Sequence, residues 1–62
     1  MIFYYEMQVG CGLHVAHDLN QAEQELRAEH GWANFKFVRE AEKDDIAWVG
    51  SMGGWVPQEA RS

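Results

Sequence analysis

Three residues of zinc-ligand type lie close together near the start of the chain. Cys11, His14 and His17 are spaced three apart, and thiolate and imidazole are ordinary ligands of zinc. In a strand, however, residues three apart point to opposite faces, and a second chelating half is missing unless His30 supplies it. A small metal-binding protein is therefore an alternative. We favour a turn cysteine with two surface histidines, and expect no metal and no cofactor.

Cys11 also has the residue type of a nucleophile. A turn between Gly10 and Gly12 would expose its thiol, and His14 is near in sequence as a base. A reactive thiolate needs electropositive surroundings, whereas ten acidic residues outnumber five basic ones in this chain. A chain of 62 residues also leaves little room for a substrate pocket. We therefore predict that the protein is not an enzyme.

The carboxylates form two groups that suit a basic partner. Glu25 and Glu29 lie four residues apart in a predicted helix, where like charges repel slightly. The second group surrounds a predicted turn and comprises Glu40, Glu42, Asp44 and Asp45. We predict that these six residues bind lysines and arginines of a partner. The alternative is a solvated helix face and a solvated turn.

The net charge of −5 limits the class of partner. Nucleic-acid binders neutralise phosphates with basic side chains, so direct binding of DNA or RNA is not expected. The same charge is attracted to basic protein surfaces, which include nucleic-acid-binding grooves. We predict a protein complex with such a surface as the partner, although this charge also serves solubility alone.

Size and composition predict one folded, cytoplasmic domain over residues 1–62. The apolar share of 47% is too high for a disordered chain. No segment is long and apolar enough to span a membrane, and no signal peptide is visible at the aromatic and acidic start. Cys11 is the only cysteine, which suits a reducing compartment.

Local patterns predict a hairpin followed by a helix. Alternation over residues 1–9 places Phe3, Tyr5, Met7 and Val9 on one face of a strand. Residues 10–12 then read as a glycine turn, and residues 13–17 as a second strand. A helix is predicted over residues 19–30, with Asp18 or Asn20 as N-cap and Gly31 as the C′ residue. Its apolar stripe is Leu19, Ala22 and Leu26.

After the helix the patterns predict strands alone. They are a strand over residues 34–41 with Phe35 and Phe37 inward, a polar turn at 42–45, a strand at 46–50, a turn at 51–54, a short strand at Trp55-Val56 and a frayed tail over 57–62. Short connections favour antiparallel pairing. The predicted fold is therefore α+β, a four- to five-stranded antiparallel sheet with one helix on one face, in the order ββαββ(β).

A single helix covers only one face of such a sheet. The other face would carry some of Tyr4, Val38, Ala47 and Val49, which are more apolar than a solvated face needs. One interpretation is scattered surface apolar residues. The other is a surface for homodimerisation or for an apolar partner, which we keep as an alternative function.

The size and element order resemble the small phage-encoded anti-CRISPR proteins that have a five-stranded antiparallel sheet and one helix. The resemblance covers nearly the whole chain. Its parts are the strand 2–9, the glycine turn and strand through His17, the helix with Leu19, Gln21 and Ala22, the strand 34–40, the Trp48 hairpin and the closing Gly54-Trp55-Val56. It implies an inhibitor that docks on a CRISPR effector complex in the host cytosol and blocks binding of target DNA or of a nuclease.

Overall fold

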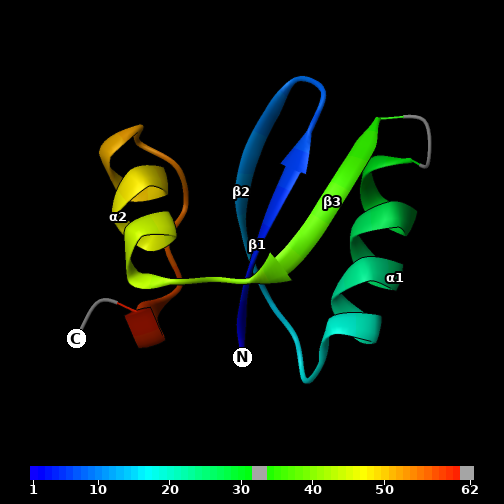
Figure 1. Cartoon of the computed structure of the whole chain (residues 1–62), viewed down its shortest axis with the longest axis horizontal. Helices are drawn as coiled ribbons and strands as arrows, with labels where there is room; N and C mark the ends of the chain where they lie inside the picture. The colour runs from blue at the N-terminus through cyan, green and yellow to red at the C-terminus, as the bar shows by residue number, and fades with distance from the viewer. Residues whose placement is uncertain (32–33, 61–62) are drawn as a thin grey trace.

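The computed structural model describes residues 1–31 and 34–60 of the chain. Its elements are β1 (Ile2–Met7), β2 (Gly10–Val15), α1 (Leu19–His30), β3 (Phe35–Glu40), α2 (Lys43–Ser51) and a 3-10 turn (Gln58–Ala60). The strands form one antiparallel sheet in the order β2-β1-β3, and the two helices flank it on opposite sides (Figure 1). The α+β antiparallel class is confirmed. The prediction of one helix on four or five strands is wrong for the described residues.

The opening hairpin turns earlier than predicted. Met7 pairs with Gly10, so the turn lies at Gln8 and Val9 and not at residues 10–12. Gly12 instead pairs with Tyr5 inside the sheet, where an added Cβ would lie 2.7 Å from the phenol oxygen of Tyr5. Gly12 therefore serves a close approach of the Tyr5 ring across the strands, and its turn-forming character misled the prediction.

Helix α1 has the predicted bounds and caps. The Asp18 Oδ1 accepts a hydrogen bond from the backbone N–H of Gln21 at 2.7 Å. The Gln21 side chain in turn accepts one from the backbone N–H of His17 at 2.8 Å. Gly31 has a φ of 86°, and its N–H donates to the carbonyl of Arg27. Local hydrogen bonds thus fix both ends of this helix.

The first core lies between α1 and the sheet. Phe3, Ala16 and Ala22 form a buried cluster against which Val38 packs, and Leu26 of α1 is 1% exposed. The prediction that Leu19 packs into this core is wrong, because that side chain is 47% exposed. Leu19 is the first residue of the helix, at the end of the stripe and beyond the buried side chains.

Strand β3 does not direct both phenylalanines to α1 as predicted. The register shifts between Glu6 and Met7, so that Phe37 pairs with Glu6 and Phe35 with Met7. Phe35 lies under the Arg27 guanidinium of α1, whereas Phe37 contacts the ring of Tyr4 on the other face. A β-bulge of this kind adds one residue and breaks the two-residue alternation.

Residues 43–51 form α2, where the sequence predicted part of a turn and a strand. Glu42 is the N-cap, and its backbone N–H donates to the Asp45 carboxylate at 2.8 Å. Ile46 and Val49, three residues apart, then pack toward the sheet. A short apolar run does not by itself distinguish a strand from a helix. Here the hydrogen bond that the Asp45 carboxylate accepts from the Glu42 N–H begins a helix.

The second core lies between α2 and the sheet. Tyr4, Leu13 and Val49 are buried together, with Ile46 and Val56 packed beside them. The pKa of Tyr4 is raised to about 12, mainly by its hydrogen bond with Cys11 and next by its burial in this core.

The predicted open sheet face is therefore covered. Tyr4 and Val49, predicted as an open dimerisation surface, are buried, and Val38 faces α1. These residues therefore do not form an open sheet face, because a second helix covers Tyr4 and Val49. Homodimerisation itself stays a prediction.

The chain after α2 runs back along this layer without a strand. Val56 is partly buried in the second core, and Pro57 is buried. The predicted tail over residues 57–62 thus begins with a buried residue and the 3-10 turn, and its residues 61 and 62 lie outside the described residues. Within the described chain, neither helix has the length and apolar character to cross a membrane.

Candidate protein-interaction surface

The sheet separates the three residues of zinc-ligand type. Cys11 packs beside Tyr4 in the α2 layer. His14 lies on the α1 side, with its Nε2 2.8 Å from the Glu25 Oε1. His17 follows the end of β2. Over residues 1–31 and 34–60, no three His, Cys, Asp or Glu side chains are grouped to hold a metal ion. The geometry therefore gives no support to the metal-binding alternative.

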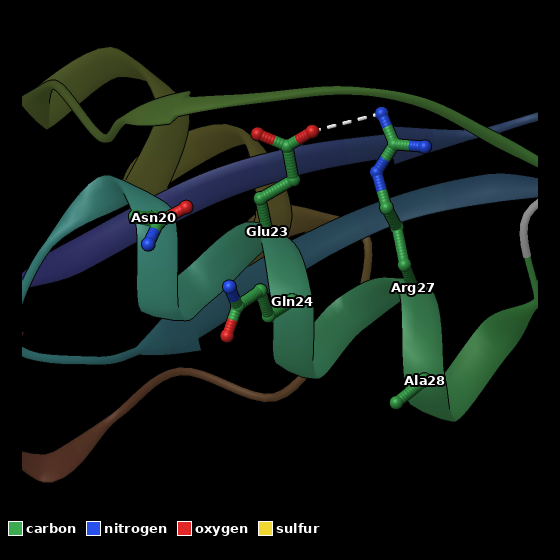
Figure 2. A pocket seen from close by; sticks show the side chains of 5 residues that line it. All are labelled: Asn20, Glu23, Gln24, Arg27 and Ala28. Atoms are coloured by element: carbon green, nitrogen blue, oxygen red, sulfur yellow. Dashed lines mark ion pairs between the residues drawn. The ribbon is translucent and has the colours of Figure 1, made fainter.

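A hollow of about 380 Å³ lies on the outer surface of α1. Figure 2 shows its lining side chains, which all come from this helix: Asn20, Glu23, Gln24, Arg27 and Ala28. The Arg27 guanidinium and the Glu23 carboxylate pair along its edge at 2.8 Å. Side chains of a single helix surround no substrate, so the hollow is a feature of a solvated, ion-paired helix surface.

The two predicted carboxylates of α1 differ in their surroundings. Glu25 is held in place, because it pairs with His14 and also accepts a 3.2 Å hydrogen bond from the Gln21 side chain. Glu29 is exposed. The pKa of Tyr5 is raised, mainly by burial of its ring and next by the negative charge of Glu29. Of this pair, Glu29 is the carboxylate available to a partner.

The four predicted carboxylates around the start of α2 also differ in their hydrogen-bond partners and exposure. Asp45 has a structural role, because both terminal nitrogens of Arg39 donate to it, one at 2.8 Å. The hydrogen bond from Arg39 holds the pKa of Asp45 below its usual range. Glu42 is the N-cap, while Glu40 ends β3 and Asp44 lies in the first turn of α2, both exposed. Of these four carboxylates, Asp45 is thus already engaged by Arg39 and by the Glu42 N–H.

The structure does not merge the two predicted groups into one patch. Glu29 belongs to α1 and Asp44 to α2, and these helices lie on opposite sides of the sheet (Figure 1). Glu29, Glu40 and Asp44 are exposed and make no hydrogen bond or ion pair with the other residues that the structure describes. These three carboxylates are the part of the predicted set that remains free for a partner.

Sequence reasoning missed an apolar surface on the α2 layer. Trp48 is 55% exposed, Met52 is 50% exposed and Trp55 is 61% exposed. Large exposed aromatic and methionine side chains are typical of protein interfaces. Asp44, Trp48 and Met52 are spaced four apart, which is a helical signal, but the interpretation of residues 46–50 as a strand concealed it.

We name the outer surface that carries Asp44, Trp48 and Met52, spaced four apart along α2 and its C-cap, the α2 surface. It combines an acidic group with apolar side chains, whereas the described outer surface of α1 is mainly polar. Comparison with models of known protein families, with curated proteins and with solved structures finds no match to this chain.

Proposed function

We propose that this protein acts by binding a positively charged surface of a nucleic-acid-binding protein complex, and that it inhibits the complex by covering that surface. The observation that carries the proposal is the set of exposed carboxylates without protein partners, Glu29, Glu40 and Asp44, on a chain of net charge −5. Such charge accelerates encounter with a basic groove and opposes binding to phosphate.

The pairing of the basic residues supports this proposal. Arg27 pairs with Glu23, and Arg39 pairs with Asp45. Both described arginines are thus partly neutralised by carboxylates within their own layers. The charge left for a partner is predominantly negative, which favours a partner rich in lysine and arginine.

A CRISPR effector complex is the partner that we propose to test first. The resemblance to small anti-CRISPR proteins included five strands and one helix, and the described residues have three strands and two helices. Size and acidic charge remain in support. In this proposal the protein acts in the cytosol of a host cell and blocks binding of target DNA or of the nuclease.

The test combines co-elution with a DNA-binding assay. A purified type I effector complex is mixed with a slight molar excess of the protein, separated by gel filtration and assayed with target DNA. Co-elution with loss of DNA binding is the expected result. Co-elution with DNA binding intact would point to a block of nuclease recruitment. Absence of co-elution across effector subtypes would overturn the CRISPR assignment.

Charge-reversal variants test the electrostatic basis in any complex found. Glu29→Lys combined with Glu40→Lys should weaken binding strongly, and wild-type affinity should fall as salt rises. Val9→Lys is the matched control for an added positive charge, because Val9 is 92% exposed in the β1–β2 turn. Salt-independent binding with equal affinities of all three proteins would contradict the proposal.

A further inference from the structure

The α2 surface carries a carboxylate and an indole at helical spacing. Asp44 and Trp48 are four residues apart in α2, and such residues lie on the same face with Cβ atoms about 5–6 Å apart. Met52 continues the same line at the end of the helix, and Trp55 follows after the turn. These four side chains make no polar or ring contact with another residue of the described chain.

Elsewhere, two arginines of the described chain each lie beside both a carboxylate and an aromatic ring. The Arg39 Cζ lies 4.8 Å from the ring centroid of Tyr4, and its guanidinium pairs with Asp45. This arrangement satisfies the guanidinium with hydrogen bonds at its edge and with the ring against its face.

A second arginine of the described chain also lies beside a carboxylate and an aromatic ring. The Arg27 Cζ lies 4.8 Å from the ring centroid of Phe35, and its Nη2 lies 2.8 Å from the Glu23 Oε1. Two independent sites, one in each layer, therefore show which groups this fold places around a guanidinium. Asp44 and Trp48 supply the same pair of groups, but on the outside of the molecule.

We propose that the α2 surface binds an arginine side chain of a partner protein, with Asp44 pairing to the guanidinium and the Trp48 ring stacking on it. Indole is the best of the aromatic rings for this contact. Met52 contributes apolar area beside the arginine stem. The inference rests on the proposed function and deepens it, because it names arginine, and not lysine, as the group recognised.

Charge complementarity selects this occupant over a second copy of the chain. Each copy has a net charge of −5 and has Asp44 on this surface, so two α2 surfaces facing each other would repel. Arginine is enriched at protein interfaces and in grooves that bind phosphate. An arginine-bearing protein surface therefore satisfies both the acidic and the apolar parts of the α2 surface.

The experiment is an NMR titration of the ¹⁵N-labelled protein with two synthetic peptides. One is an arginine-rich peptide, and its twin has lysine in place of every arginine. We expect the indole N–H resonance of Trp48, assigned by its absence in Trp48→Ala, to shift with the arginine peptide. Affinity for the lysine twin should be about fivefold weaker, since an ammonium lacks the planar face.

Matched variants separate this site from general acidity. Asp44→Asn and Glu59→Gln each remove one exposed carboxylate, and only Asp44→Asn should weaken binding of the arginine peptide, by about fivefold. Trp48→Ala should weaken it similarly with an unchanged circular dichroism spectrum. If Trp48→Ala misfolds, the comparison of the two peptides on the wild-type protein still tests whether the site prefers arginine to lysine.

The outcomes distinguish this inference from the proposed function. Equal affinity for both peptides, with equal losses in Asp44→Asn and Glu59→Gln, would overturn the arginine site and leave a general acidic binder. Failure of both peptides to bind would overturn the arginine site, and co-elution with an effector complex would then leave the proposed function standing without it. Concentration-dependent dimerisation lost in Trp48→Ala would assign the surface to a second copy and also overturn the inference.

Discussion

Helices α1 and α2 cover opposite faces of one sheet, but their outer surfaces differ in chemistry. The described outer surface of α1 carries mainly polar side chains, including the Glu23–Arg27 pair, with Leu19 exposed at its start. That of α2 carries Trp48 and Met52, each at least half exposed. Both helices bury apolar residues against the sheet, so burial alone does not require an apolar outer surface on α2. The difference supports the proposal that α2 binds a partner, whereas the described side chains of α1 mainly complete the core.

The largest expected effect tests the α1 core. Leu26→Ala should lower the free energy of unfolding by about 2–5 kcal/mol, because it leaves a cavity at a side chain that is 1% exposed. A domain of this size has little stability in reserve, so much of the variant should be unfolded. Urea denaturation followed by circular dichroism measures the loss. The control is Leu19→Ala, which should change stability by less than about 1 kcal/mol, and equal losses would contradict the described core.

The next effect tests how the chain returns along the α2 layer. Gly54→Ala should destabilise by about 1–3 kcal/mol through overpacking, because its Cβ would lie 2.7 Å from the Val49 Cγ1 in the second core. Gly10→Ala is the matched control, since nothing lies within 4 Å of a Cβ there. Thermal melts of the two variants should differ clearly. Equal melting temperatures would show that residues 54–57 do not pack against α2 as described.

A smaller effect tests the start of α2. Asp45→Ala removes the acceptor for the Glu42 N–H and the partner of Arg39, and should cost about 1 kcal/mol at neutral pH. Asp44→Ala, in the same turn, should cost only about 0.3–1 kcal/mol, through the helix dipole. Urea denaturation of both variants beside the wild type provides the measurement.

The Asp45 effect should depend on pH. The hydrogen bond from Arg39 lowers the pKa of Asp45 in the folded state, so its stabilising contribution is present above the unfolded pKa of about 4. That contribution is lost as the pH falls through the lower folded value. The difference between wild type and Asp45→Ala should therefore shrink from pH 7 to pH 3. A constant difference would mean that Asp45 acts without its charge.

The smallest expected effect sharpens the comparison of the two helices most directly. Trp48→Ala should change the free energy of unfolding by no more than about 0.5 kcal/mol, because more than half of its side chain is exposed. The neighbouring Val49→Ala, in the second core, should cost about 2 kcal/mol for its two methyl groups. A large loss in Trp48→Ala would assign that side chain to folding and weaken its proposed role in binding.

The sequence alone determined the features that depend on neighbours along the chain. Helix α1 could be predicted at both ends, because Asp18 and Gly31 cap it through hydrogen bonds to residues three or four positions away. The side of β1 that carries Phe3 and Met7 follows from simple alternation, and both residues are buried. The net charge is a property of composition. Charge and spacing nominated six of the ten acidic residues for partner binding, but the sequence could not reveal which of the six are already paired.

Only the tertiary structure decided the rest. Residues 46–49 suit a strand or a helix, and contact of Val49 with Tyr4 and Leu13 accompanies the helix. The bulge in β3 decides that Phe37 contacts Tyr4 and not α1. The sheet separates Cys11 from His14, and Arg39 engages Asp45 from another element. Each of these outcomes depends on a contact between residues of different elements, and such contacts leave no periodic pattern in the sequence.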